Sequence, residues 1–246
     1  MLGPFLHWGD VMQGRYGDIY AREAARYDRL VRREDHAGNL WRALRALGVG
    51  PGAVIELGAG TGRLTRWLAA EGATVLAFDG AAAMLRLAQA AVRGRVSFGV
   101  ADNARVPVRD GVADVVIEGW SFGHWAEAGA RDMVDEMLRV GRPGGLAVVI
   151  ETLGTGVEEP APSALLAALY AWLEAERGFT RHVVRTDYRF ADAVEAADLA
   201  GFFFGPAMVE RLRDGVWLPE CTGVWVRRVE ADAETETDAA AASIAK

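Results

Sequence analysis

Hydrophobic positions along the chain change their spacing several times, and each change marks a predicted element. Between residues 18 and 47, apolar side chains recur every three to five positions, which predicts helix. From residue 53 to residue 150, short apolar runs alternate with stretches of helical spacing, and glycines stand between them. We expect strands over 53–57, 73–78, 96–100, 113–117 and 146–150. The helices of this region are expected from 63 to about 70, over 81–92 and over 131–140.

This alternation of strands and helices favours an α/β fold, with a mostly parallel sheet and helices on both faces. The pattern then changes. Residues 152–162 indicate a loop that contains glycine and proline, and 163–177 an apolar helix. The runs 202–212 and 224–229 lie on either side of an Arg-Asp-Gly turn and predict a closing antiparallel β-hairpin.

Three segments follow from this reading. We predict a capping helical segment over 1–47 and a main domain over 48–230, in which 152–190 covers the substrate. Residues 231–246 are acidic and rich in alanine, which is typical of a disordered tail or of a solvated helix end.

Composition excludes several kinds of chemistry. The 246 residues include 27 basic and 34 acidic side chains, a net charge of −7, without the basic excess expected of a nucleic-acid binder. Lys246 is the only lysine, so the body of the fold has no Schiff-base lysine and no lysine-containing phosphate loop. Cys221 is the only cysteine, and the four histidines lack the spacing of metal ligands, so we expect no bound metal. The N-terminus has no basic leader and no apolar run approaches 18 residues, which predicts a soluble, cytoplasmic protein that does not span a membrane.

The glycine-rich segment Glu56-Leu57-Gly58-Ala59-Gly60-Thr61-Gly62 is the strongest chemical signal. It lies between the first predicted strand and the helix that follows it. Alternate glycines allow a sharp turn and let a ligand lie against the backbone, at a helix N-terminus that attracts anionic groups. The dinucleotide fingerprint G-x-G-x-x-G would need glycine at position 63, which is Arg63.

Two further acids follow predicted strands. Asp79 ends the second strand, where it can accept hydrogen bonds from both ribose hydroxyls of a nucleoside, or cap the next helix. Asp102 follows the third strand and can accept from an adenine amino group, while Asn103 presents its backbone amide; the pair can also form a simple turn. Acids at three successive strand ends, without a phosphate-binding lysine, suit a positively charged ligand that contains adenosine. S-adenosylmethionine is such a ligand.

These segments resemble the motifs of class I S-adenosylmethionine-dependent methyltransferases, and the ubiquinone-biosynthesis-like group that acts on small molecules in particular. Residues 54–65 (VIELGAGTGRLT) resemble the first motif, 78–79 the second, 101–102 the third and 114–125 (DVVIEGWSFGHW) the fourth. The resemblance implies a Rossmann-like, doubly wound sheet of seven strands that ends in the antiparallel hairpin. It also implies S-adenosylmethionine as cofactor and S-adenosylhomocysteine as product.

The resemblance implies a role for individual residues as well. Glu56 would hold the methionine ammonium, Asp79 the ribose, and Asp102 with Asn103 the adenine. Met84 would pack against the adenine ring or belong to the core. The complete predicted cofactor site is Tyr20, Glu56, Gly58, Ala59, Gly60, Gly62, Asp79, Gly80, Met84, Ala101, Asp102, Asn103 and Glu118.

Methyl transfer to an already activated carbon chiefly needs alignment and exclusion of water, and a general base only when the acceptor is protonated. His124 is the first candidate base, because its ordinary pKa lies near neutral pH, and Glu151 and Tyr16 follow. Trp120, Trp125 and His182 are candidate substrate contacts, although the two tryptophans can equally pack a helix onto the sheet. The Asn/Asp-Pro-Pro-Tyr/Phe motif of enzymes that methylate DNA bases is absent after the fourth strand, so we expect a small-molecule acceptor with an O, N, S or C nucleophile.

Two other functions stay open at this point. A non-catalytic protein that binds S-adenosylmethionine would need no evident catalytic residue. An NAD-dependent dehydrogenase would share the fold, although Arg63 disfavours it. Neither the acceptor nor the oligomeric state follows from the sequence.

Overall fold

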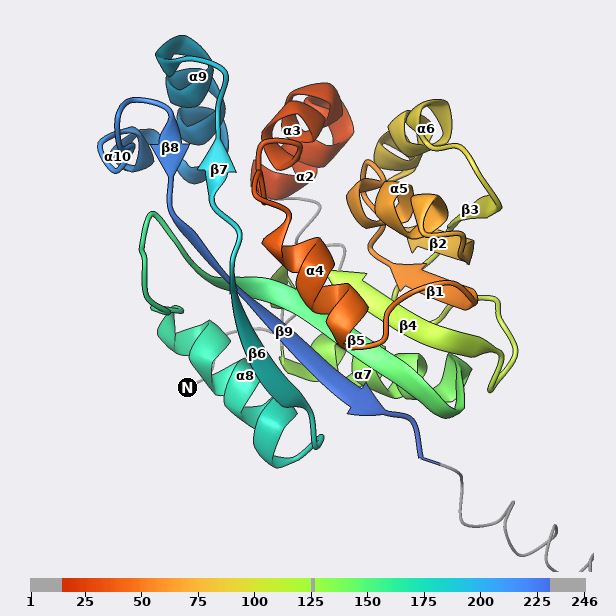
Figure 1. Ribbon diagram of the computed structural model, residues 1–246. Helices are drawn as coiled ribbons and strands as arrows, with labels where there is room; N and C mark the ends of the chain where they lie inside the picture. Colours follow the sequence, from red (N-terminus) through yellow and green to blue (C-terminus); the bar gives the residue numbers. More distant parts are fainter. Residues whose placement is uncertain (1–14, 125–126, 231–246) are drawn as a thin grey trace, which may run out of the picture.

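The computed structural model describes residues 15–124 and 127–230 and contains a seven-stranded sheet. The strand order is β3-β2-β1-β4-β5-β9-β6. The first five strands in this order are parallel, and β9 runs antiparallel to both β5 and β6 (Figure 1). The sheet strands are β1 (Ala53–Leu57), β2 (Thr74–Asp79), β3 (Val96–Val100), β4 (Ala113–Gly119), β5 (Gly141–Thr155), β6 (Thr180–Arg185) and β9 (Glu220–Arg228). The predicted fold class is confirmed.

Helices cover both faces of the sheet. On one face lie α4 (Asn39–Ala46), α5 (Arg63–Ala70) and α6 (Ala82–Ala91), whose leucines pack on Val75 and Val148. On the other face lie α7 (Glu127–Val140) and α8 (Ala164–Ala175), which pack on Val116 and Val149. The central strands are buried on both faces, as their nearly continuous apolar runs predict.

A third group of elements lies together beyond the carboxyl ends of the parallel strands (Figure 1). It consists of α2 (Arg15–Arg22), α3 (Ala24–Val31), α9 (Ala193–Phe204), α10 (Pro206–Val209) and the two-stranded sheet of β7 (Tyr188–Arg189) and β8 (Trp217–Leu218). Its own small core joins Leu30, Tyr188, Leu199 and Leu218. These elements roof the ends of the strands where the glycine-rich loop lies.

The N-terminal helix breaks where the sequence predicts continuity. Between α3 and α4 the chain turns, and Asp35 adopts a left-handed φ of 53°. Its carboxylate accepts hydrogen bonds from the backbone N–H groups of Asn39 and Leu40, at 2.7 and 3.1 Å, and so satisfies two donors at the start of α4, whose N-cap residue is Gly38. The break turns Glu34 inward, where its side chain is buried.

The predicted closing hairpin is wrong in its first strand. Residues 202–212 include the end of α9 and all of α10, and β9 pairs with β6 instead. The aromatic run Phe202–Phe204 packs as a helix into the roof, and this tertiary contact overrides its strand-like composition. The edge strand β6 lacks apolar alternation because much of it is exposed. The predicted loop at 152–162 is likewise shorter, since β5 continues to Thr155.

The proposed division into segments 1–47, 48–230 and 231–246 stays a prediction. Residues 1–14 and the tail lie outside the described residues. Within 152–190, the structure forms the end of β5 and all of α8, β6 and β7, so Thr180–Arg185 is part of the sheet.

Candidate functional site

The glycine-rich loop connects β1 to α5 through three glycines in the left-handed region, Gly58, Gly60 and Gly62, with φ of 70°, 56° and 82°. L-residues with a side chain rarely adopt such angles. At Gly58 the crowding is also steric, since an added Cβ would lie 2.8 Å from the Cβ of Ser121. The loop therefore needs glycine at this position both for its backbone angle and for its close approach to the end of β4.

Asp79 holds this loop in place from the end of β2. One carboxylate oxygen accepts from the N–H of Gly60 at 2.8 Å, and the other from the N–H of Ala81 at 2.7 Å. The side chain is buried, which raises its pKa, and the two backbone hydrogen bonds act in the opposite direction. A carboxylate can accept about four hydrogen bonds, so the two oxygens retain capacity for hydroxyl groups of a ligand.

Asn103 and Asp102 differ although they are neighbours. Asn103 is buried, and its amide oxygen accepts from the N–H of Gly58 at 3.1 Å. Asp102 is exposed, and its carboxylate accepts from the N–H of Ala104 at 2.9 Å, as in the simple turn left open by the sequence. Ala101 and Gly80 lie half-buried beside them, at the ends of β3 and β2.

Glu56 lies at 1% exposure inside β1, beneath the glycine-rich loop. The hydroxyl of Thr65 donates to its Oε2 at 2.6 Å. Burial raises the pKa of Glu56 to about 8. A cationic group at this position would restore the ionised form, because an opposite charge lowers the pKa of a buried acid.

A narrow crevice of about 30 Å³ runs over Glu56, Gly58, Ala59 and Gly60 and under Tyr27 of α3. The groups around it suit S-adenosylmethionine. A buried acid can bind the ammonium, a strand-end carboxylate can accept from the ribose hydroxyls, and a ligand can lie against the glycine backbone. The crevice by itself is smaller than that ligand. Met84 and Tyr20 lie in the small buried cluster between α2 and α6 that holds these helices down.

The end of β4 carries a second buried acid. Glu118 is fully buried, and its Oε1 accepts from the N–H and hydroxyl of Ser121 and from the N–H of Phe122, at 2.6 to 2.9 Å. Burial and the nearby charge of Glu151 raise its pKa well above the ordinary range. Trp120 has a left-handed φ of 57°, a strained conformation for a bulky residue and one that is concentrated at functional sites.

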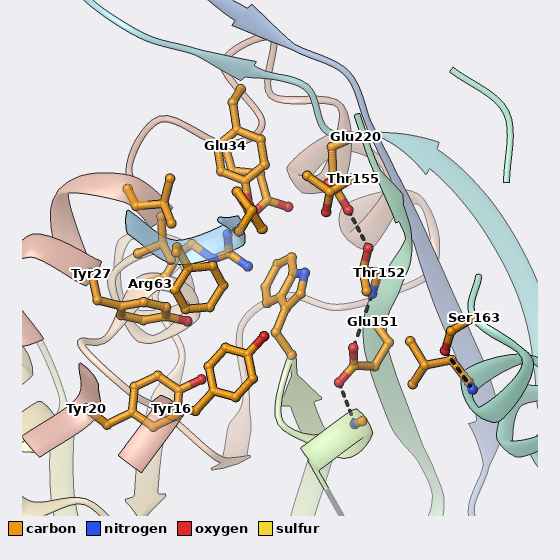
Figure 2. Close-up of a pocket in the computed structure, with 18 of the residues that line it drawn as sticks. Tyr16, Tyr20, Tyr27, Glu34, Arg63, Glu151, Thr152, Thr155, Ser163 and Glu220 are labelled. Atoms are coloured by element: carbon orange, nitrogen blue, oxygen red, sulfur yellow. Dashed lines mark hydrogen bonds and ion pairs between the residues drawn. The ribbon is translucent and has the colours of Figure 1, made fainter. Parts of the chain in front are cut away.

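Beside the crevice lies a cavity of about 400 Å³ (Figure 2). Tyr27, Val31, Arg63 and Trp120 line both spaces, so the two adjoin. The aromatic walls of the cavity are Tyr16, Tyr20, Tyr27, Trp120, Tyr188, Phe203 and Phe204. They come from α2, α3, β7, α9 and the end of β4.

Charged groups line the cavity as well. Arg63 forms an ion pair with Glu34, which also accepts from the hydroxyl of Tyr188 at 2.8 Å. The Arg63 guanidinium lies 3.1 Å from the ring centroid of Trp120. Glu151 and Glu220 complete the acidic lining, from the carboxyl half of β5 and the start of β9.

Both of these acids are buried, and burial raises the pKa of Glu151 to about 7 and that of Glu220 to about 8. Glu151 accepts from the N–H of Gly123 at 2.9 Å. Glu220 accepts from the hydroxyl of Thr152 at 2.6 Å. At neutral pH, Glu151 can therefore exchange a proton with a bound molecule.

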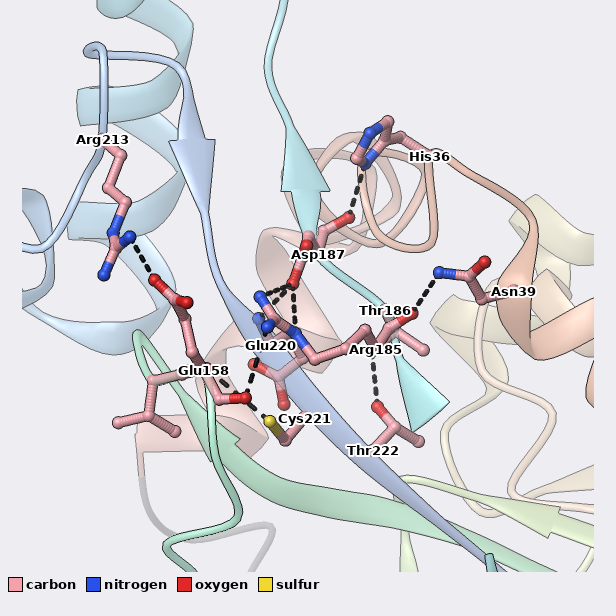
Figure 3. A network of polar contacts seen from close by, with 11 residues as sticks. His36, Asn39, Glu158, Arg185, Thr186, Asp187, Arg213, Glu220, Cys221 and Thr222 are labelled. Carbon is pink, nitrogen blue, oxygen red and sulfur yellow. Dashed lines mark hydrogen bonds and ion pairs between the residues drawn. The ribbon is translucent and has the colours of Figure 1, made fainter. Parts of the chain in front are cut away.

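A polar network behind the cavity fixes the backbone of Glu220 (Figure 3). Its N–H donates to Asp187 at 2.9 Å, and its carbonyl accepts from the N–H of Thr186 at 3.0 Å. Arg185 donates to the same Asp187 carboxylate, at 2.7 and 3.0 Å. These hydrogen bonds between β6, β7 and β9 thus fix the backbone from which the Glu220 carboxyl group projects.

The predicted residues separate into those that the structure brings to this site and those that it does not. Tyr16, Tyr20, Trp120 and Glu151 line the cavity. His182 lies on the exposed edge strand β6 and is not among the residues that line it. His124 belongs to a short 3₁₀ turn whose Phe122 is buried, and Trp125 lies outside the described residues.

Sequence reasoning missed most of the cavity. Glu34, Tyr27, Tyr188, Phe203 and Glu220 were not predicted there. They are separated by up to 193 positions (27 to 220), and no spacing motif connects them. The sequence marks Arg63 only as the residue that departs from the dinucleotide fingerprint, and not as part of a cavity.

Residues 54–145 match the family model for a methyltransferase domain. The demethylmenaquinone methyltransferase of Clavibacter sepedonicus is 38% identical over 117 residues, which are 46% of this chain and 47% of that protein. The malonyl-[acyl-carrier protein] O-methyltransferase of Methylococcus capsulatus is 33% identical over 150 residues, 58% of this chain and 53% of the relative. The chain thus spans about half the length of the curated relatives that it matches.

Residues 54–145 form a methyltransferase domain, similar to those of class I S-adenosylmethionine-dependent methyltransferases. This domain implies S-adenosylmethionine as the cofactor. A crystal structure of an S-adenosylmethionine-dependent methyltransferase from Aquifex aeolicus has the same fold, with a TM-score of 0.51 and 17% identity over 76% of this chain and 87% of that one. The [4+2]-cyclase SpnF is equally similar, with a TM-score of 0.53 and 18% identity over 78% of this chain and 80% of that one. The fold alone therefore does not determine the reaction.

The described residues also bear on membrane insertion and metal binding. Within the described ranges, none of the helices is both long and apolar enough to cross a membrane. Across the same ranges, His, Cys, Asp and Glu side chains nowhere gather in a group of three that could hold a metal ion.

Proposed function

We propose that this protein transfers a methyl group from S-adenosylmethionine to a small molecule bound in the 400 Å³ cavity. The observation that carries the proposal is that the predicted cofactor crevice and the cavity adjoin each other. A crevice over the glycine-rich loop adjoins an aromatic cavity, and Arg63 and Trp120 line both. A cavity of this volume suits a small molecule.

Each part of the site has its own task in this proposal. S-adenosylmethionine, when bound, supplies a methyl group on a positively charged sulfur. Glu56 binds its ammonium group and Asp79 its ribose hydroxyls. The glycine backbone lies against the cofactor, and Asn103 holds Gly58 in position. Asp102 and Glu118 remain predicted contacts, at the adenine and near the methionine end.

The chain's contribution to the reaction is alignment and exclusion of water. The roof formed by α2, α3 and α9 lines the cavity with aromatic side chains, which limits the access of solvent to the transferred methyl group. Where the acceptor still carries a proton, Glu151 is the base best placed to remove it, because its carboxyl lines the cavity and its pKa lies near neutrality. His124 stays the alternative base that the sequence predicts.

Thermal unfolding with separate additions of S-adenosylmethionine, S-adenosylhomocysteine and NAD tests this proposal. A ligand at 100 times its dissociation constant adds about 2.7 kcal/mol of stability. For a chain of this size that raises the unfolding midpoint by roughly 5–10 °C. We expect the shift with the first two ligands and a smaller one in Asp79→Asn. A shift with NAD alone, or with none of the three ligands, contradicts the proposal.

A further inference from the structure

We propose that the methyl acceptor is a nitrogen base, an amine carried on an apolar body, bound in the cavity that Glu34, Glu151 and Glu220 line. This inference rests on the proposed function and adds the chemical class of the substrate. It follows from the charges, the unpartnered oxygens and the aromatic walls of the cavity.

The charge of the cavity is unbalanced. Three carboxyl groups line it, and Arg63 is the one cation among its described lining residues. Arg63 is already paired with Glu34 and stacked on Trp120. Glu151 and Glu220 thus have no cationic partner in the lining, and buried carboxylates without one either hold a proton or await a positive charge.

Two of the carboxyl groups also have an oxygen with no partner at hydrogen-bond distance. Glu34 Oε1 is buried and has no hydrogen-bond partner among the described residues. Glu220 Oε2 is buried and has no partner at hydrogen-bond distance there, although the Thr155 hydroxyl interacts with the Glu220 carboxyl group. The residues are 8% and 2% exposed, and their carboxyl groups face the same space as that of Glu151 (Figure 2). Buried acceptors of this kind are rare in folded proteins, and a ligand that donates N–H groups would satisfy them.

The walls suit the same ligand. Tyr20, Tyr27 and Phe203 form a chain of rings with centroids 5.4 and 5.3 Å apart, and Tyr16 lies 5.5 Å from Phe203. Ring faces attract cations and also pack against an apolar body. Burial raises the pKa of Tyr27 to about 12, so its hydroxyl stays neutral and does not compete with the carboxyl groups.

The reaction balances in this setting. The lone pair of the neutral amine nitrogen forms the new bond to the methyl carbon, and the electron pair of the broken carbon–sulfur bond stays on sulfur. The positive charge moves from sulfur to nitrogen. Where the amine enters as an ammonium ion, the Glu151 carboxylate first takes the proton that frees the lone pair, and the methylated product then leaves as an ammonium ion. Carboxylates placed beside the nitrogen stabilise the charge that develops there, whereas a phenolate, enolate or carboxylate acceptor would be repelled.

Matched acceptors test this inference. We suggest 2-phenylethylamine, N-methyl-2-phenylethylamine, 2-phenylethanol and phenylacetate, which share an apolar body and differ in the polar end. Binding is measured by calorimetry with S-adenosylhomocysteine present, and transfer by radiolabelled methyl groups from S-adenosylmethionine. We expect the amines to bind at least tenfold tighter than the alcohol, and the carboxylate to bind weakest. Equal binding of amine and alcohol, or a preference for the alcohol or the carboxylate, overturns the inference.

A pair of variants assigns the effect to the cavity. Glu220→Gln keeps the size of the side chain and an oxygen for Thr152, and removes the charge. We expect it to weaken amine binding about tenfold, and to leave binding of 2-phenylethanol and of S-adenosylhomocysteine unchanged. Glu210→Gln, on the exposed end of α10, is the matched control and should change none of the three. An equal loss for amine and alcohol in Glu220→Gln would indicate a merely structural role.

Failure of the inference and failure of the proposed function give different results. If neither S-adenosylmethionine nor S-adenosylhomocysteine raises the unfolding midpoint, the proposed function itself is wrong. If both do, but the amines show no advantage, the cofactor site stands and only the amine assignment falls.

Discussion

The crevice over the glycine-rich loop and the cavity beside it are built in opposite ways. The crevice is backbone held by hydrogen bonds, and the groups that fix it, from Glu56 to Asn103, lie within 48 consecutive residues. The cavity is made of side chains drawn from Tyr16 to Glu220. A site built from backbone leaves a sequence pattern, because particular residues are needed at fixed spacing. A site built from distant side chains tolerates many combinations and leaves none.

The largest expected effect separates two acids of the crevice that look alike in the sequence. Asp79 is buried and holds the loop through Gly60, whereas Asp102 is exposed and bonds to its own turn. Hydrogen bonds to a charged acceptor contribute about 1.5–3 kcal/mol each. Asp79→Asn should therefore lower S-adenosylmethionine affinity at least 100-fold, and Asp102→Asn about tenfold or less, as measured by calorimetry. Equal losses would show that the exposed acid carries as much of the site as the buried one.

The next effect tests whether the loop depends on its backbone. Gly58 and Gly72 both have positive φ, but an added Cβ at Gly72 meets nothing within 4 Å. A left-handed residue costs about 1–2 kcal/mol, and overpacking adds about 1–3 kcal/mol. We expect Gly58→Ala to destabilise by roughly 2–4 kcal/mol in urea unfolding and to abolish cofactor binding. Gly72→Ala should lose only the roughly 1–2 kcal/mol of the left-handed backbone and should bind the cofactor normally. Equal losses of stability and of cofactor binding in the two variants would contradict the steric argument.

A third effect concerns the buried acids of the cavity. Glu220 has a pKa of about 8 in the folded chain and an ordinary value near 4.5 when unfolded. Its contribution to stability is complete below pH 4.5 and is lost as the pH rises to 8, because the unfolded chain then releases a proton that the folded chain retains. Glutamine cannot ionise, so Glu220→Gln should raise stability by at least about 1 kcal/mol at pH 8.5, with little change at pH 4.5.

Urea unfolding at the two pH values measures this difference, with Glu210→Gln as the exposed control. Glu210→Gln should change the free energy of unfolding by the same amount at both pH values. If Glu220→Gln changes stability equally at pH 4.5 and 8.5, its carboxyl group does not titrate abnormally, and the cavity is wetter than its burial indicates.

The smallest expected effect marks the border of the cavity. His182 lies on the exposed strand β6, so His182→Ala should change stability by less than about 0.5 kcal/mol. It should also leave the KM of any acceptor unchanged in a methyl-transfer assay. A raised KM with normal stability would extend the acceptor site to the sheet edge and restore the substrate contact that the sequence suggested.

How far the sequence could go is clear from single elements. The strand Val96–Val100 agrees with its predicted bounds, since a short apolar run between glycine-containing turns has few other options. Residues 202–212 did not follow prediction, because three successive phenylalanines suit a strand until a helical roof offers them partners. Glu151 was predicted as a base from its position after a strand, whereas Glu220, which faces the same cavity, sits in a stretch with no such signal.

The sequence by itself determined the alternating fold, the glycine-rich loop and the acids at the strand ends, because these depend on local backbone geometry and on fixed spacing along the chain. Only the tertiary structure decided which acids are buried, that Arg63 pairs with Glu34, and that Glu34, Glu151 and Glu220 face one aromatic cavity. These properties arise where distant segments pack together and exclude water. Burial then sets the pKa values on which the chemistry of the cavity depends.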